Sequence, residues 1–493
     1  MPSDATHALD TIRNHSGRRQ TEGLSPEEIE RFLESDPQLR RAIGLAAEAH
    51  PRLLREAPEL LAMDEAELCT ALLADYESFY PDEGTMPYVP LAAAGSWIVT
   101  THGAVVHDSG GYGMLGMGHA PQVLLDRMAE PAVMANVMTP SFSQKRLADR
   151  LRAEIGHTSG GCPFHRFICM NSGSEAVAVA SRIADINAKK QTDPGGAHEG
   201  RTIRRLALAE SFHGRTTRPA RASHATRPIY QKHLASFRDA DDLVVVEPND
   251  LDGLRAAFDR ADRDGVFFEA LYLEPVLGEG TPGLALTREF YDLARSLTAA
   301  RGTVLIVDSI QAAIRAQGCL SIVDYPGFQG CEPPDLETYS KALNAGQYPL
   351  SVLALSEPMA SLYVKGIYGN TMTTNPRALE VACAVLDALT EERRQHIRER
   401  GDELKAGLTA LAKEHPDAVR GVSGTGLMVN AELDPERYPV TGREGFEQWL
   451  RRHGVSMIHG GKNGLRFTPS LDITSAEIDL IVGRVHQGLT ALA

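Results

Sequence analysis

The feature that most constrains the fold is a repeated alternation that starts at about residue 165. A short apolar run is followed by a glycine-containing or polar turn, an amphipathic helix and then another apolar run. Parallel strands joined by helices give this pattern, so it predicts an α/β fold with a mostly parallel sheet and a ligand site beyond the carboxyl ends of the strands. One linking helix is clear, because Thr287 can cap it and Gly302 can end it. The strand candidates are residues 167–170, 206–209, 243–246, 270–273, 304–307, 336–339 and 350–355.

The flanking regions have different patterns and predict further parts. Residues 1–85 are expected to form an N-terminal helical extension, in which Ser25-Pro26-Glu27-Glu28 is a capping box that opens a helix. We interpret the extension as a packing or oligomer-contact element in preference to a lid over a ligand. Residues 86–145 are predicted to be the N-terminal part of a small domain and a linker, 146–385 the large α/β domain, and 386–493 the rest of the small α+β domain.

Composition excludes several classes of protein. The formal net charge of −15 argues against nucleic acid and anionic membranes as partners, and no apolar run approaches the length of a membrane span. The first residues lack a secretory signal, and six scattered cysteines cannot form a disulfide framework, so we expect a cytoplasmic protein. His157, Cys162, His165 and Cys169 crowd together, but Cys169 lies in a strand-like run. We therefore expect no metal site.

Two polar residues end or follow neighbouring strand candidates. Asp308 ends the apolar run that starts at Val304, and Lys341 follows the run 336–339. A carboxylate and a lysine at one sheet edge suit pyridoxal phosphate, because the lysine forms a Schiff base and the acid keeps the pyridine nitrogen protonated. A strand-end aspartate also caps turns, and most lysines are solvated, so these two residues leave both interpretations open. The chain has only nine lysines, and Lys341 alone follows a strand-like run.

Three further segments bear on a cofactor. Residues 111–116 match G-x-G-x-x-G, but no strand ending in an acidic residue follows, which argues against a nicotinamide dinucleotide. The segment 171–175 follows a strand and opens a helix, so it is either an anion site at a helix N-terminus or a simple serine cap. Phe212 offers a face for a planar ring unless it belongs to the core, and Arg215 offers a partner for a carboxylate.

Together these motifs resemble a known family. In order and over residues from about 86 to 490, the chain is similar to the class III aminotransferases of fold type I, close to the ornithine and acetylornithine aminotransferases. The motifs that carry the resemblance are Gly118-His119-Ala120-Pro121, Asn171-Ser172-Gly173-Ser174-Glu175-Ala176, Phe212-His213-Gly214-Arg215-Thr216, Glu274-Pro275-Val276 with Gly278-Glu279-Gly280, Asp308 with Gln311, Ser340-Lys341-Ala342-Leu343, Gly369-Asn370-Thr371 before Asn375-Pro376, Gly424-Thr425-Gly426-Leu427-Met428, and Leu465-Arg466-Phe467.

The resemblance implies a role for each cofactor-site residue. Lys341 would be the Schiff-base lysine and the proton carrier, and Asp308 would hold the pyridine nitrogen protonated. Gln311 would bond the phenolic oxygen, and Phe212 would stack on the ring. Thr371 would reach the phosphate in a neighbouring subunit, which implies a homodimer with shared active sites. The remaining cofactor contacts, to the phosphate, would come from Ser172, Gly173 and Ser174.

The resemblance also implies a substrate class. Arg466 would bind an α-carboxylate, and Glu279 would cover it when a different substrate enters. Arg215 would hold a second carboxylate, and Tyr112 would shape the pocket wall. The expected reaction moves an amino group, the ω-amino group of a diamino or ω-amino acid, to 2-oxoglutarate by a ping-pong route.

The chain departs from the family pattern near the cofactor. Ser309 stands where the family usually has glutamate, the segment 312–318 differs, and Thr373 and Thr374 stand where two glycines are common. None of these departures removes a group that the cofactor needs, but they leave other reactions open. A racemase, an epimerase or a decarboxylase keeps the same cofactor, and a non-catalytic binding subunit keeps the fold alone.

Overall fold

The computed structural model describes residues 4–238 and 240–492 of the chain and divides it into two compact units. Unit 1 comprises residues 1–125, 399–423 and 429–493, and unit 2 comprises residues 126–398 and 424–428. Helix α6 (Gln122–Ala129), helix α15 (Glu391–Glu414) and strand β11 (Val419–Thr425) run across these boundaries. Residues 1–3, on which the expectation about a secretory signal partly depends, lie outside the described residues. The predicted domain limits at 85, 145 and 385 remain predictions.

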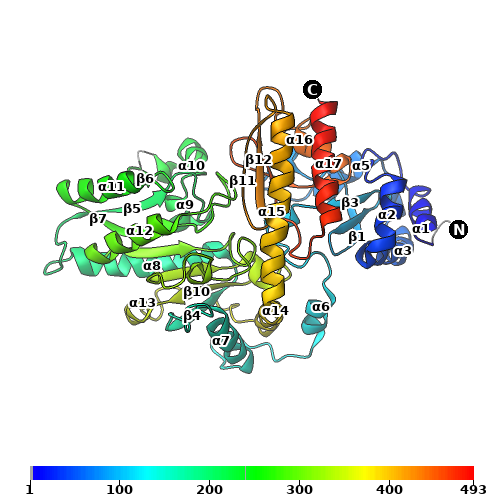
Figure 1. Cartoon of the computed structure of the whole chain (residues 1–493). Helices are drawn as coiled ribbons and strands as arrows, with labels where there is room; N and C mark the ends of the chain where they lie inside the picture. Colours follow the sequence, from blue (N-terminus) through cyan, green and yellow to red (C-terminus); the bar gives the residue numbers. More distant parts are fainter. Residues whose placement is uncertain (1–3, 239, 493) are drawn as a thin grey trace. The chain divides into compact units, whose positions relative to one another are not determined.

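Unit 2 is built on a seven-stranded sheet with the order β4-β10-β9-β8-β7-β5-β6 (Figure 1). Strands β5 to β9 pair in parallel, whereas β10 runs antiparallel to both β9 and β4. The predicted α/β class with a mostly parallel sheet is therefore confirmed. The strands are β4 (Arg166–Met170), β5 (Thr202–Leu208), β6 (Leu243–Val246), β7 (Val266–Leu273), β8 (Val304–Asp308), β9 (Leu336–Tyr339) and β10 (Ser351–Leu355).

The helices of unit 2 cover this sheet. The long helix α8 packs on β4 and on β7 to β10, and its apolar side chains Val179 and Ile183 are fully buried there. Helix α12 begins after Thr287, whose hydroxyl accepts a hydrogen bond from the Phe290 amide, and ends at Gly302 with φ 66°, as predicted. The helices are α7 (Phe142–Glu154), α8 (Gly173–Thr192), α9 (Thr217–Ala222), α10 (Arg227–His233), α11 (Leu251–Arg263), α12 (Arg288–Arg301), α13 (Glu357–Leu362) and α14 (Pro376–Asp387), with 3-10 turns η3 (Ala235–Phe237), η4 (Ile322–Asp324) and η5 (Lys341–Asn344).

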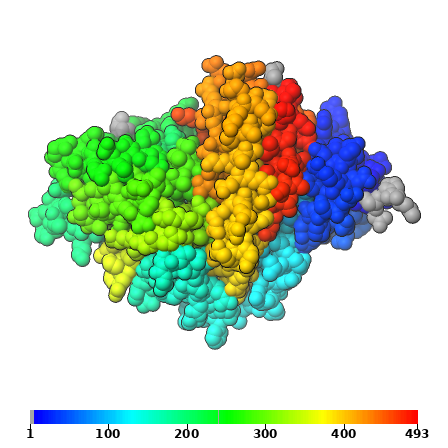
Figure 2. Space-filling model, in the orientation of Figure 1, coloured from blue at the N-terminus to red at the C-terminus, as the bar shows by residue number. Residues whose placement is uncertain are grey.

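Unit 1 holds two four-stranded sheets, with the orders β1-β2-β3-β13 and β11-β12-β15-β14. Helix α17 lies alongside the C-terminal part of α15, where the Ser475 hydroxyl donates to Glu403 at 3.2 Å, and both helices reach the surface in Figure 2. The elements are β1 (Pro90–Ala94), β2 (Trp97–Thr100), β3 (Val105–Asp108), β12 (Met428–Leu433), β13 (Val455–Ser456), β14 (Ile458–Gly460), β15 (Gly464–Phe467), α16 (Phe446–Arg452) and α17 (Ser475–Ala491), with 3-10 turns η1 (Asp82–Gly84) and η2 (Gly111–Gly113).

The N-terminal extension belongs to unit 1 and packs on its first sheet. Helix α3 contacts β1 and β2, and the Trp97 indole donates a hydrogen bond of 2.5 Å to Asp36 at the start of that helix. The predicted capping box at Ser25 is confirmed, with the Glu28 side chain bonded back to the Ser25 amide. The helices are α1 (Asp4–Arg13), α2 (Pro26–Ser35), α3 (Pro37–Glu56), α4 (Pro58–Leu61) and α5 (Glu65–Leu73). No helix among the described residues is both long and apolar enough to cross a membrane.

Candidate active site

A cavity of about 160 Å³ in unit 2 brings most of the predicted cofactor residues together. Its walls come from segments that follow β4, β5, β8 and β9, which is the carboxyl edge of the sheet where the sequence predicts a ligand. The lining residues are Ser172, Gly173, Ser174, Phe212, His213, Gly214, Asp308, Ile310, Gln311, Ser340 and Lys341. Residues separated by up to 169 positions in the chain therefore share one small space.

Asp308, the last residue of β8, is buried and held by three donors. His213 Nδ1 lies 3.0 Å from its Oδ2, so the imidazole donates there, and the Thr338 hydroxyl and the Ile310 amide donate to Oδ1 at 3.1 and 3.2 Å. His213 Nε2 is buried without a hydrogen-bond partner among the described residues. Three donors on the two carboxyl oxygens fix the orientation of this side chain.

Lys341 has a left-handed backbone conformation that residues other than glycine rarely adopt. Its φ is +45°, and Ala345 at the other end of the same 3-10 turn has φ +53°. The preceding Ser340 hydroxyl donates to the Leu350 carbonyl at 2.6 Å and so ties the turn to the start of β10. Such strain persists where the surrounding structure fixes it, and it concentrates at functional sites. The turn presents Lys341 to the cavity that Asp308 lines.

The N-terminus of α8 forms another wall. Ser172 is its N-cap and accepts a hydrogen bond from the Glu175 amide, which shows the cap and leaves the anion site a prediction. A Cβ added to Gly173 would lie 2.7 Å from Ile310 Cδ1, and one added to Gly214 would lie 2.4 Å from Ser174 Oγ. These two glycines allow three segments to meet around the end of a long helix, where free amides and the helix dipole favour an anion.

A second buried carboxyl organises the loops beside the cavity. Glu274 accepts hydrogen bonds from the Phe212 amide at 2.8 Å and the Gly278 amide at 3.0 Å. Burial raises the pKa of Glu274 to about 7. A Cβ on Gly278 would lie 2.3 Å from Gln311 Cδ, so this loop packs directly on Gln311. Glu274 thus couples the loop that carries Phe212 to the loop that covers Gln311.

The other predicted site residues lie outside this set of lining residues. Arg215 is exposed, with its guanidinium 5.2 Å from the centre of the Phe212 ring, and Glu279 is half-buried in the loop after Gly278. Thr371 is exposed in the segment before α14. Tyr112 and Arg466 belong to unit 1, where Tyr112 has φ +49° and Arg466 is buried in β15 opposite Asn430.

Three residues of the site have no role in the sequence-based prediction. His213 and Glu274 lie inside the motifs that carry the family resemblance, but only the folded chain shows that one bonds Asp308 and the other bonds Phe212 and Gly278. Thr338 lies in a buried strand, where alternation predicts only which face it shares. Its position beside Asp308 follows from the strand register.

Comparison with known proteins identifies a family that this chain matches over most of its length. The family model described as aminotransferase class-III matches residues 79–489. The chain is 29% identical over 386 residues to an acetylornithine aminotransferase of Thermosynechococcus vestitus, covering 76% of this chain and 86% of that protein. It is 27% identical over 416 residues to ornithine aminotransferase 2 of Staphylococcus saprophyticus, covering 82% and 96%.

Solved structures show the same fold. The crystal structure of the ornithine aminotransferase from Toxoplasma gondii ME49 superposes with a TM-score of 0.73 at 20% identity, covering 89% of this chain and 98% of that one. N-acetylornithine aminotransferase from Stenotrophomonas maltophilia K279a gives 0.65 at 23% identity, covering 86% and 98%.

Fold and site together define an α/β enzyme of the pyridoxal-phosphate-dependent type. Within that class, the chain belongs to the class-III aminotransferase family, because the family model matches most of its length. The residues present fit the cofactor. The α8 N-terminus can receive a phosphate, the buried Asp308 carboxylate can face a pyridine nitrogen, and the strained turn supplies a lysine amine to the same cavity.

Proposed function

We propose that this aminotransferase moves the ω-amino group of a diamino or ω-amino acid to 2-oxoglutarate in two half-reactions. The observation that carries the proposal is the single cavity in which Lys341, Asp308 and the α8 N-terminus meet. The names of the relatives, ornithine and acetylornithine aminotransferases, support the donor class.

The position of each cavity residue suits a particular role in the reaction. When bound, pyridoxal phosphate supplies an electron-withdrawing ring that weakens the bonds to the amine-bearing carbon of the substrate. Lys341 would hold the cofactor through its amine and, once displaced by the substrate amine, carry the proton from that carbon. Asp308, oriented by His213 and Thr338, would keep a proton on the pyridine nitrogen. Gln311 would donate to the phenolic oxygen, and Phe212 would stack on the ring.

The phosphate would lie at the start of α8. Gly173 and Ser174 supply backbone amides there, and the Ser172 hydroxyl can still donate while its oxygen caps the helix. For the substrate, Arg466 would bind the α-carboxylate of glutamate and Glu279 would cover that arginine when the ω-amino donor enters. Arg215 would take a second carboxylate, and Tyr112 would limit the pocket.

A homodimer is part of the proposal, and the surface of unit 2 supports it. Large apolar side chains are exposed on two segments, residues 133–142 and the residues around Met372. Val133 and Phe142 are each 83% exposed, Met138 is 76% exposed and Met372 is 75% exposed. Apolar groups that gather at a surface mark an interface. Thr371 adjoins Met372, so a second copy seated on these segments would bring Thr371 to its neighbour and let it reach the neighbour's phosphate.

Light scattering tests the dimer. Phe142→Asp is expected to shift the protein to monomer and to weaken cofactor binding, because the Thr371 contact is lost with the interface. Leu234→Asp, which changes an exposed leucine of unit 2 outside these segments, is the matched control and is expected to stay dimeric. A monomeric parent protein would contradict the proposal.

We also propose that the protein acts in the cytoplasm. The class of reaction suits that compartment, and so do the cysteines, none of which is in a disulfide.

The reaction is tested by the visible absorbance of the lysine-bound cofactor. We expect L-glutamate alone to abolish this absorbance and 2-oxoglutarate to restore it, with no such absorbance in Lys341→Ala. A visible absorbance that forms but does not change when glutamate is added would contradict the roles proposed for Arg466 and Glu279. Turnover of an amino acid with no keto acid present would instead indicate racemisation or decarboxylation.

A further inference from the structure

Strand β8 ends in Asp308, and strand β9 leads into the turn that carries Lys341. The side chains of these two strands are joined on the cavity face and also on the opposite face of the sheet. In the β8–β9 register Asp308 lies opposite Thr338, and their side chains bond to each other on the cavity face. Successive strand residues point to opposite faces. Ser309 directly follows Asp308 at the end of β8, and Glu337 directly precedes Thr338 in β9. Their side chains meet on the far face, where the Ser309 hydroxyl donates to Glu337 Oε1 at 2.6 Å.

The Glu337 carboxyl also holds the far end of the segment that leaves β8. Its Oε2 accepts from the Ser321 hydroxyl at 2.5 Å, and its Oε1 accepts from the Ile322 amide at 3.0 Å. Residues 310–320, which include the cofactor-facing Gln311, therefore form a loop whose two ends are bonded to one side chain. Glu337 itself is fully buried, with an exposed fraction of 0%.

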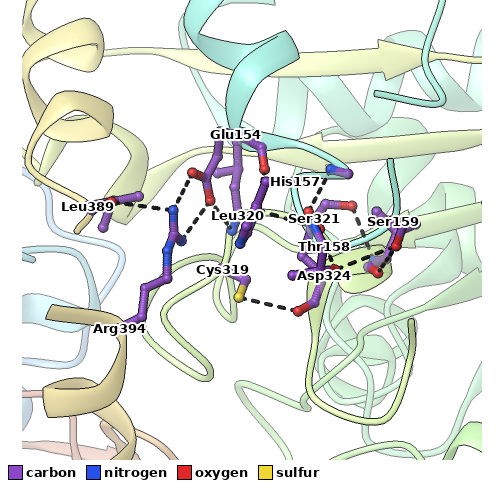
Figure 3. A network of polar contacts seen from close by, with 12 residues as sticks. Glu154, His157, Thr158, Ser159, Cys319, Leu320, Ser321, Asp324, Leu389 and Arg394 are labelled. Carbon is purple, nitrogen blue, oxygen red and sulfur yellow. Dashed lines mark hydrogen bonds and ion pairs between the residues drawn. The ribbon is translucent and has the colours of Figure 1, made fainter. Parts of the chain in front are cut away.

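The returning end of this loop and the residues just after it are held by further polar contacts, which Figure 3 shows. Glu154 accepts from Arg394 at 2.6 Å and from the Leu320 amide at 3.3 Å. Asp324 accepts from the Thr158 amide at 3.0 Å and from the Thr158 hydroxyl at 2.8 Å. The loop is thus rigid where it returns to the sheet, and Glu337 joins that returning end to Ser309, the residue after Asp308.

From this geometry we propose that Glu337 is a positioning residue that fixes Asp308 and Gln311 for cofactor binding and catalysis. The inference deepens the proposed function and rests on it. A hydroxyl bonded on the far face prevents the backbone after Asp308 from shifting, and the same carboxyl keeps Gln311 from moving away with its loop. Burying a carboxyl is costly unless donors satisfy it, and Ser309, Ser321 and Ile322, which donate to Glu337, define the two ends of this loop.

The competing explanation is that Glu337 contributes to stability alone. Glu65 provides a matched control, because it is also fully buried and also accepts from neutral donors, the amides of Gln20 and Thr21 at 2.9 and 2.7 Å. Glu65 lies in the N-terminal extension, in unit 1. Replacing either carboxyl by leucine leaves its buried donors unsatisfied, so both variants should lose stability, but only one should affect the cofactor site.

The experiment measures the dissociation constant of pyridoxal phosphate by fluorescence titration, the visible absorbance maximum of the bound cofactor, and the free energy of unfolding. Glu337→Leu is expected to raise the dissociation constant about tenfold or more and to shift the maximum, since tenfold corresponds to the loss of one strong hydrogen bond. Glu65→Leu is expected to change the dissociation constant less than about twofold at a comparable loss of stability. Glu337→Gln keeps an acceptor for Ser309 and Ile322 and should restore binding to within about twofold of the parent.

Ser309→Ala keeps the inference testable if Glu337→Leu fails to fold, because it removes only the bond behind Asp308. We expect it to raise the dissociation constant about fivefold. Equal effects of Glu337→Leu and Glu65→Leu on cofactor binding, or an unchanged constant in Ser309→Ala, would overturn the inference. A parent protein that binds no pyridoxal phosphate, or in which Lys341→Ala changes nothing, would instead overturn the proposed function.

Discussion

Replacing the buried Glu337 by glutamine should change how stability depends on pH. Burial raises the pKa of Glu337 from an ordinary 4.5 to about 7, and the hydrogen bonds from Ser309 and Ser321 oppose that shift only in part. Between these two values the unfolded chain has released a proton that the folded chain keeps. The stability of the parent protein therefore falls as pH rises through this window.

The magnitude follows from the size of the shift. Each pKa unit corresponds to about 1.4 kcal/mol, so the penalty of the ionised Glu337 approaches about 3 kcal/mol above pH 7. Glutamine mimics the neutral carboxyl, because its oxygen accepts from Ser309 and Ile322 and its amide can donate to the Ser321 hydroxyl. Relative to the parent, Glu337→Gln should thus be more stable by less than about 1 kcal/mol near pH 5 and by up to about 3 kcal/mol at pH 8.

Chemical denaturation at several pH values, with excess pyridoxal phosphate, measures this difference. Taking the difference between variant and parent cancels the contributions of all other titrating groups. Glu67→Gln, which removes an exposed carboxylate of α5, gives the baseline. A difference that stays constant between pH 5 and 8, or that favours the parent as pH rises, would refute the assignment of a buried proton to Glu337.

Three further perturbations test the site and the frame around it. Asp308→Asn should lower kcat by about 10- to 100-fold in a steady-state assay, because a charged hydrogen bond contributes about 1.5–3 kcal/mol; full activity would exclude a role for the charge. Gly214→Ala should lose about 1–3 kcal/mol more stability than Gly195→Ala, since both have positive φ but only the first would place a Cβ against a neighbouring side chain. Glu154→Gln should cost about 3–5 kcal/mol of unfolding free energy, because it removes the buried ion partner of Arg394 at 2.6 Å and leaves only the exposed Glu391 at 3.9 Å; a smaller loss would show that the pair is solvated.

Local sequence determined the elements that position the site. Apolar runs of four to eight residues, with helical periodicity and caps between them, were sufficient to predict the strands that became β6 and β8 and the helix that became α12, since these signals act over a few neighbouring residues. Strand β1 was missed, because Pro90-Leu91-Ala92-Ala93-Ala94 has neither alternation nor β-branched residues. Its pairing with β2 supplies what its own sequence lacks.

The residues that face the cavity follow from where strands end. Asp308 ends one strand-like run and Lys341 follows the next one closely, and parallel strands bring their carboxyl ends to one edge, so their meeting could be predicted from sequence. The family resemblance added Gln311, and it favoured a cofactor role for Phe212 and the glycine–serine turn, which the residues alone had left open. That these side chains line one cavity is a property of the folded chain.

The contacts behind and beside those residues were decided by tertiary structure alone. His213 meets Asp308 across 95 positions, and Glu337 meets Ser309 across 28 and Ser321 across 16. No periodicity or spacing signals such a pair, because the register between strands and the path of a loop depend on packing over the whole sheet. Glu337 lies in a strand whose four residues are all buried, and only the structure shows which hydroxyls and amides make the burial of its carboxyl possible.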